Sequence, residues 1–166
     1  MMKLRRLGQS GVTFVEMLLV MGLLAIFLVI LTTIFTSTLD VQNQTDSYSA
    51  TVSDGRFIMS RLNYDIARAT AITTPAALGG SGAGLVMTVN ATTYTYALVG
   101  SNLQLTAGAN SGNLNGDGTS VSNLSFQRIG NSGGKDTIRY SFTLTSTTLH
   151  ERRADTQTFT STAELR

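Results

Sequence analysis

An uncharged run of 19 residues near the N-terminus limits what this chain can fold into more than any other feature. The run extends from Met17 to Phe35. As an α-helix it would be roughly 28 Å long, close to the thickness of the hydrocarbon core of a bilayer. A chain of 166 residues has room for one modest domain besides such a segment. The sequence therefore predicts one membrane-spanning helix and one further domain.

Positive charge is concentrated before this run. Lys3, Arg5 and Arg6 are three of the twelve Lys and Arg residues, and the nine that follow stand against ten Asp and Glu residues. Cationic flanks of membrane helices stay in the cytoplasm, so we expect the N-terminus inside and the C-terminal part outside. The nearly neutral remainder has no cationic stripe, which disfavours nucleic acid as a partner. With no cysteine, the chain can form neither disulfides nor thiolate metal sites.

Helical periodicity continues after the uncharged run. Between Asp40 and Thr70, apolar or small residues alternate at spacings of four and three, which places them on one face of a helix. These residues are Tyr48, Val52, Gly55, Met59, Leu62, Ile66 and Ala69. We expect this face to be core rather than a partner-binding surface. A solvated face is expected for the charged residues Asp54, Arg61, Asp65 and Arg68.

Beyond Pro75 the composition shifts to Gly, Ser, Thr and Asn, and the periodicity shifts to two. Strands are expected at about residues 85–89, 92–98, 102–105, 121–129, 137–145 and 157–165, with a flexible glycine-rich connection at 79–84. The sequence thus predicts an α+β fold. A long helix from about Thr13 to Ile72, membrane-spanning in its first half and amphipathic in its second, would pack on a mainly antiparallel β-sheet in two layers.

Sites for chemistry are scarce. The segment Asn113–Gly118 matches the first half of a calcium loop, but Leu124 stands where the bidentate glutamate belongs, so a plain turn is favoured and calcium binding stays open. His150 is the single histidine and has no companion ligands in the sequence; we expect it in a charged turn between two late strands. We therefore expect no catalytic residue, no metal site and no cofactor.

The residues around Gly11 point to a specific family. The chain begins with a basic leader, followed in order by Gly11, Val12, Glu16 and the apolar run. This segment resembles the N-terminal processing motif of type IV prepilins and type II secretion pseudopilins. The resemblance implies that a prepilin peptidase cleaves after Gly11 and methylates the new N-terminus at Val12. Phenylalanine or methionine is more usual after the glycine. The implied division is a leader at 1–11, a transmembrane or filament-core helix at 12–39 and an extracytoplasmic pilin-like domain at 40–166.

The resemblance also implies a function. The chain would be a structural subunit of a type IV pilus-like or type II secretion filament, and not an enzyme. We expect a minor subunit, because residues 61–69 look like the helix end of J-type minor pseudopilins. Its partners would be prepilin peptidase, other pilin or pseudopilin subunits, the inner-membrane assembly platform and, before assembly, membrane lipid. It would be a single-pass inner-membrane protein that later enters an extracytoplasmic filament. Whether the output is protein secretion, DNA uptake, adhesion or motility is left open.

Glu16 places a carboxylate at the start of the apolar run, where its charge needs a partner. An ionised carboxylate in an apolar segment costs several kcal/mol unless it is paired. Cleavage after Gly11 creates an amine at Val12, one helical turn away, so Glu16 could bind its own N-terminus or that of a neighbouring subunit. The alternative is that Glu16 only marks the membrane surface.

Two other classes of function compete with the filament subunit. One is an uncleaved, membrane-anchored binding module, which needs neither Gly11 nor Glu16. The other is a small extracytoplasmic hydrolase, for which no nucleophile elbow of the Gly-x-Ser-x-Gly type is convincingly present.

Processing is the first testable consequence. Co-expression with a prepilin peptidase should remove 11 residues and leave Val12 at the N-terminus, and Gly11→Leu should block the cut because a bulky side chain hinders the extended backbone at the protease. Intact mass and N-terminal sequencing check this. An uncut chain, or cleavage beyond Phe35, would contradict the motif.

Overall fold

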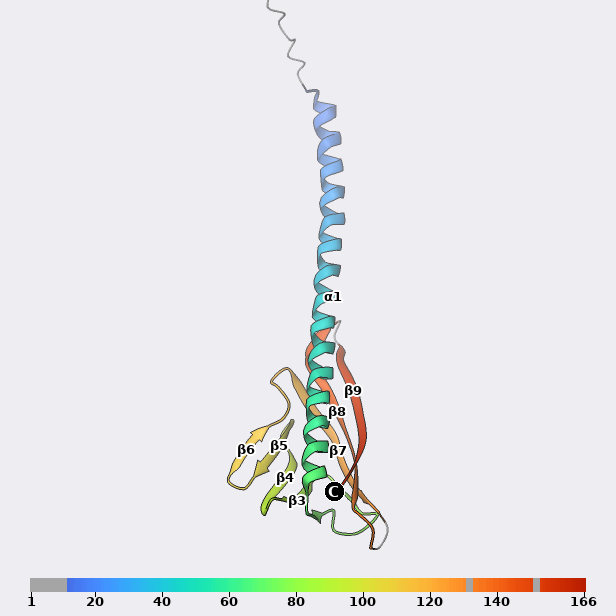
Figure 1. Cartoon of the computed structure of the whole chain (residues 1–166). Coiled ribbons are helices and arrows are strands. Elements are labelled where there is room, and N and C mark those ends of the chain that lie inside the picture. The colour runs from blue at the N-terminus through green and yellow to red at the C-terminus, as the bar shows by residue number, and fades with distance from the viewer. Residues whose placement is uncertain (1–11, 131–132, 151–152) are drawn as a thin grey trace, which may run out of the picture. The chain divides into compact units, whose positions relative to one another are not determined.

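A computed structural model describes residues 12–130, 133–150 and 153–166 of the chain. Within these ranges it contains one helix and nine strands (Figure 1). They are α1 (Phe14–Arg68), β1 (Ala71–Thr74), β2 (Ser81–Gly82), β3 (Leu85–Val89), β4 (Thr92–Val99), β5 (Asn102–Ala107), β6 (Asn110–Asn113), β7 (Thr119–Ile129), β8 (Thr137–His150) and β9 (Arg153–Glu164). The predicted α+β class, with a long N-terminal helix and antiparallel strands, is confirmed. The chain divides into two compact units, Met1–Val41 and Gln42–Arg166.

The strands of the second unit form two antiparallel sheets, where we expected one. Sheet A has the order β1-β3-β4-β5-β6, and sheet B has the order β2-β7-β8-β9. All six expected strands are present. The sequence analysis missed β1, β2 and β6, which are only two to four residues long. Strand β2 lies inside the expected flexible connection, because Ser81 and Gly82 pair with β7. Pairing of Ala71–Thr74 with β3 also ends α1 earlier than the expected Ile72.

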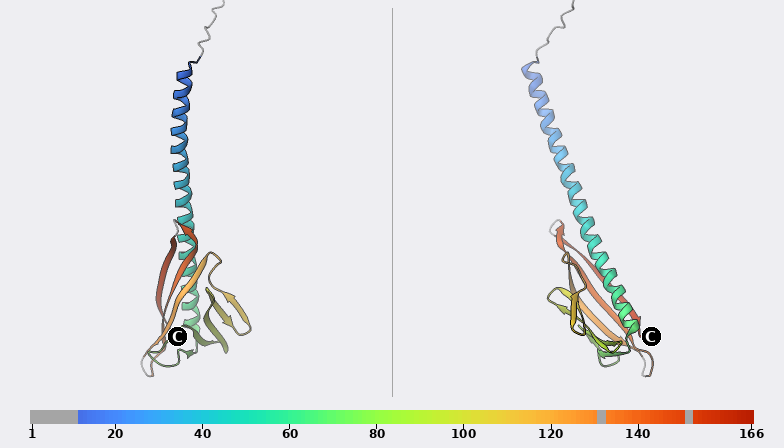
Figure 2. Two further views of the ribbon diagram at one scale, coloured as in Figure 1. Left: turned by 180° about the vertical axis from the view of Figure 1, so that it is seen from behind. Right: turned by 60° about the vertical axis from the view of Figure 1, so that its left-hand side comes forward.

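The part of α1 in the second unit covers both sheets (Figure 2). Ile58, Leu62 and Ile66 are fully buried. They share one core with residues of sheet A, including Leu85, Met87 and Tyr96, and of sheet B, including Phe126, Tyr140 and Phe142. The hydroxyl of Tyr140 donates to the carbonyl oxygen of Met59 at 3.2 Å and to Oδ1 of Asn63 at 2.8 Å. Apolar burial and a few directed hydrogen bonds therefore hold this part of the helix in register on the sheets.

The buried face of α1 is rotated from the expected one. Gly55, Leu62, Ile66 and Ala69 are buried as predicted, but Tyr48 is 54% exposed. The remaining buried positions are Ser47, Thr51, Ile58 and Asp65. The prediction was wrong here because it counted only apolar residues, glycine and alanine as buried, and it left out the polar residues Ser47, Thr51 and Asp65. A small polar residue can be buried if its group is satisfied, as when the Thr51 hydroxyl donates to the carbonyl oxygen of Ser47 at 3.0 Å.

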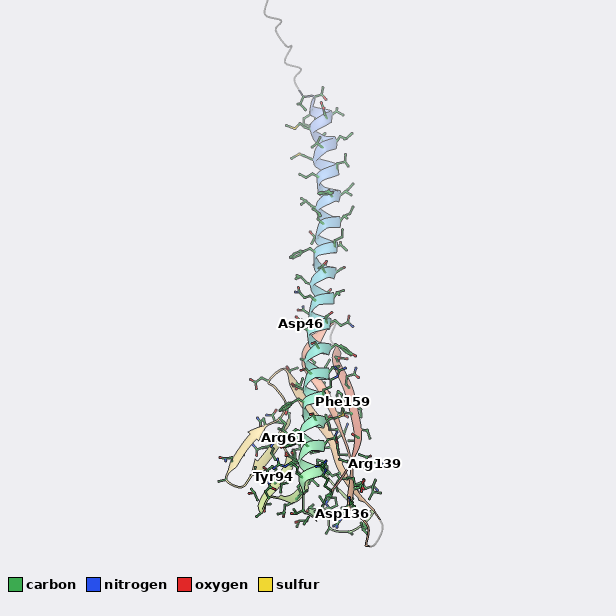
Figure 3. The ribbon with its side chains drawn as sticks, viewed as in Figure 1. Asp46, Arg61, Tyr94, Asp136, Arg139 and Phe159 are labelled. Carbon is green, nitrogen blue, oxygen red and sulfur yellow. The ribbon has the colours of Figure 1, made fainter. Side chains whose placement is uncertain are left out.

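Gly55 is required by packing rather than being a weak point of the helix. A Cβ built at Gly55 would overlap the ring of Phe159, which belongs to β9 and lies against the helix (Figure 3). Phe159 in turn stacks on Phe142, with 5.3 Å between ring centroids. The missing side chain therefore lets β9 approach α1 closely.

Gly55→Ala should destabilise the second unit by about 1–3 kcal/mol, because the added methyl group meets a ring that is itself fixed by packing. Thermal unfolding of the detergent-solubilised chain, followed by circular dichroism, measures this. Gly22→Ala is the matched control in the same helix, since nothing lies within 4 Å of the added Cβ. Equal melting temperatures for the two variants would show that the Phe159 contact is not tight.

Candidate functional site: the N-terminal end of helix α1

Thr13 determines where helix α1 begins. The backbone N–H of Glu16 donates to Oγ1 of Thr13 at 3.3 Å, and the N–H of Met17 donates to the Thr13 carbonyl oxygen at 3.1 Å. Thr13 is therefore the N-cap, and Glu16 is the third residue of the helix. A threonine followed three residues later by glutamate is also the sequence of a capping box. The helix thus starts directly after the predicted cleavage point.

This geometry gives Glu16 a second possible role that sequence reasoning missed. Glu16 is exposed in the first turn, where the helix dipole favours a negative charge. The spacing of Thr13 and Glu16 was the available signal. Val12, the predicted first mature residue, is 64% exposed and lies just before the N-cap. Gly11 and the leader lie outside the described residues, so their predicted role stays a prediction.

The helix that follows is apolar and solvent-exposed in the chain by itself. Every residue from Val12 to Asp46 is exposed. Among the described residues, α1 is the helix long and apolar enough to cross a membrane; its best 18-residue window has a mean hydropathy of 2.9, and none of that window is buried. An apolar surface of this extent is unfavourable in water. The helix is therefore compatible with a single membrane span near the N-terminus.

A polar cluster around Asp65 lies in the core of the second unit. Asp65, expected on the solvated face, is fully buried. Its Oδ2 accepts hydrogen bonds from the Tyr96 hydroxyl at 2.5 Å and from Nε of Arg61 at 2.7 Å. Burial raises the pKa of Tyr96, and the neighbouring Asp65 raises it further, so the phenol stays protonated and donates. The expectation of a solvated Asp65 was wrong because two donors from the protein bond to its Oδ2, while its buried Oδ1 has no hydrogen-bond partner among the described residues. The cluster ties α1 to β4.

A shallow groove of about 260 Å³ lies beside this cluster. It is lined by Phe57 and Arg61 of α1 and by residues of β5, β6 and the loop after β6. Its one charged side chain, Arg61, is already paired with Asp65. In the described part of the chain, no three His, Cys, Asp or Glu residues gather where they could hold a metal ion. The groove is therefore better suited to contact than to acid–base or metal chemistry.

In the segment Asn113–Gly118, where the sequence favours a turn, Asn115 and Gly116 form hydrogen bonds within the protein. The Asn115 side chain is buried; its Oδ1 accepts from the N–H of Leu103 at 2.9 Å, and its Nδ2 donates to the carbonyl oxygen of Thr119 at 2.8 Å. Oδ2 of Asp54 accepts from the N–H of Gly116 at 2.9 Å and from the Thr119 hydroxyl at 2.5 Å. Asp54, also expected to be solvated, instead fastens this loop to the helix.

Comparisons with protein-family models, with curated proteins and with solved structures find no match to this chain. The arrangement itself, one long apolar N-terminal helix with antiparallel sheets, is compatible with a pilin-like fold.

Asp54→Ala should lower the free energy of unfolding by about 1.5–3 kcal/mol, because two hydrogen bonds to a charged acceptor are lost and the loop after β6 is released. Denaturant titration of the solubilised chain measures this. Asp46→Ala, at an exposed position of the same helix, is the control and should change stability by less than about 0.5 kcal/mol. Similar losses in both variants would mean that the loop contact contributes nothing specific.

Proposed function

We propose that this chain is a structural subunit of a type IV pilus-like or type II secretion filament, processed after Gly11 by a prepilin peptidase. In this proposal Val12 becomes the methylated N-terminus, and the apolar part of α1 resides first in the inner membrane and then among the helices of other subunits. The second unit stands outside the cytoplasm. The role proposed for the chain is structural: it is a building block of the filament.

One observation carries the proposal. The core of the second unit consists of residues from Ile58 onward, whereas the described uncharged run from Met17 to Phe35 is apolar and exposed throughout. A surface of this kind suits two successive environments, lipid and a bundle of apolar helices, because both are free of water. The basic leader ending at Gly11 supplies the signal for moving from one to the other.

Glu16 is the residue proposed to guide assembly. Its carboxylate is exposed at the start of an apolar helix, where an ionised group is costly in lipid unless an amine lies nearby. The amine created at Val12 is the nearest available in the mature chain. Parallel subunits at different heights would place the amine of one chain beside Glu16 of another, which would fix their axial offset.

The membrane-anchored binding module is the second candidate. The groove between α1 and the β5–β6 hairpin favours it, since such a surface could receive a ligand. A binding module of this kind has no need for Gly11 or for a carboxylate at position 16. The two candidates therefore differ in what happens when Glu16 is changed.

Glu16→Gln should be cleaved and inserted like the parent, while its incorporation into filaments falls at least tenfold. Glutamine can replace glutamate in a capping box, so the variant keeps that role and loses only the charge. Cleavage is measured by intact mass, and incorporation by the amount of protein in sheared filaments.

The matched control is Thr13→Ala, which removes the N-cap hydroxyl and leaves the charge of Glu16. It should weaken the first helical turn by about 1 kcal/mol and still assemble. If Glu16→Gln assembles as well as the parent, Glu16 is only an interfacial carboxylate. If Thr13→Ala fails in the same way as Glu16→Gln, assembly needs an intact first helical turn, and the loss in Glu16→Gln is no longer specific evidence for an amine partner.

A further inference from the structure

We infer that strand β9 of one copy pairs with strand β6 of the next copy, so that adjacent second units join edge to edge through backbone hydrogen bonds. The inference rests on the proposed function, because it needs copies held in the same orientation. It adds a specific contact between the parts outside the membrane.

Strand β9 is a long edge strand with little to protect it. It is the last strand of sheet B, and within the described residues it pairs on one side only, with β8. From Ala154 to Glu164 no residue is fully buried. The central stretch, residues 156–163, contains neither charge nor proline. Natural edges usually carry such residues to prevent pairing, so this edge is chemically open to another strand.

Strand β6 provides a second open edge, in sheet A. Its four residues, Asn110–Asn113, are uncharged and all exposed, and it pairs on one side only, with β5. The groove lined by Phe57 and Arg61 also includes residues of this strand. The side chains of an incoming strand would have room there.

The directions of the two strands follow from contacts with α1. Strand β7 runs the same way as the helix: its first residue, Thr119, bonds to Asp54, and Arg128 near its end donates to the carbonyl oxygen of Ile72. Since β8 is antiparallel to β7 and β9 is antiparallel to β8, β9 also runs with the helix.

Strand β6 runs the opposite way. Strand β6 leads into Gly116, whose N–H donates to Asp54 of the helix. The neighbouring β5 begins near Leu103, which bonds to Asn115, and continues to Leu105, which pairs with Tyr96. Because Tyr96 bonds to Asp65, β5 runs with the helix, and β6, antiparallel to it, runs against the helix. Copies that share one orientation would therefore bring β9 and β6 together as an antiparallel pair.

The placement of the two edges allows the contact to repeat. Strands β6 and β9 lie on opposite sides of the second unit in both Figure 1 and the reversed view of Figure 2. A contact between two different surfaces of the same chain propagates from copy to copy instead of closing as a dimer. Pairing of β9 with β9 in like-oriented copies would be parallel. The free edge of β1 is less suitable, because Arg128 donates to its Ile72 carbonyl oxygen.

Because the chain contains no native cysteine, introduced cysteines can form disulfides only with one another. Thr160 and Ser111 are exposed on β9 and β6. The double variant Thr160→Cys, Ser111→Cys is produced as the full chain together with prepilin peptidase and an assembly platform. Sheared filaments are then oxidised, and disulfide-linked species are separated on non-reducing gels. The expected result is a ladder of covalent dimers, trimers and higher species. The matched control is the double variant Thr160→Cys, Ser125→Cys, because Ser125 is exposed in β7, away from the outer edge of the sheet. This control should give at most about a tenth of the cross-linked species.

The outcomes separate this inference from the proposed function. Filaments that form without a ladder overturn the strand pairing and leave the filament proposal standing. Dimers from Thr160→Cys alone, in amounts equal to the double variant, also overturn it, because they mean that like edges meet. If no filament sediments from the parent chain under conditions in which processing is complete, both the pairing and the proposed function are contradicted.

Discussion

The unpaired apolar surface of α1 is the constraint on which the rest of the molecule depends. The chain exposes every residue from Val12 to Asp46, and the 19 residues from Met17 to Phe35 carry no charge. Because this surface finds no cover in its own unit, it must be satisfied by the surroundings. The described part of the first unit is therefore compatible with a membrane span, whereas the second unit has a closed core of its own.

The second unit, in contrast, buries its apolar residues in a core of its own. Helix residues such as Ile58 and Leu62 are fully buried, and directed polar contacts add to the packing. Asp54 fastens the loop after β6, Asp65 bonds to Tyr96 of sheet A, and Asn63 accepts from Tyr140 of sheet B. The same helix thus contacts both sheets through different residues, which gives the unit a defined surface with open strand edges.

The sequence predicted the fold class, the long helix and the six longer strands, because each has a strong periodic signal. It did not predict the exact buried face of α1. Asp65 and Asp54 are charged, and their burial or loop contact depends on Tyr96 and Thr119, partners 31 and 65 residues away in the sequence. Such pairings cannot be read from local periodicity. The two-residue strand β2 was missed for the same reason, since only its partner strand defines it.

At the candidate site, the sequence carried most of the information. Gly11, Val12 and Glu16 are predicted from their order in the sequence and stay predictions, while the structure adds Thr13 as the N-cap. The cap matters for interpretation because it offers Glu16 a local function beside the intermolecular one.

The most direct test is to ask what touches the apolar helix before and after assembly. A photo-crosslinking amino acid at Leu24, an exposed position in the middle of the uncharged run, reports its neighbours in cells. The account predicts cross-links to lipid when the assembly machinery is absent and to other copies of the same chain when it is present. Cross-links to lipid under both conditions would contradict a filament subunit and leave a membrane-anchored module.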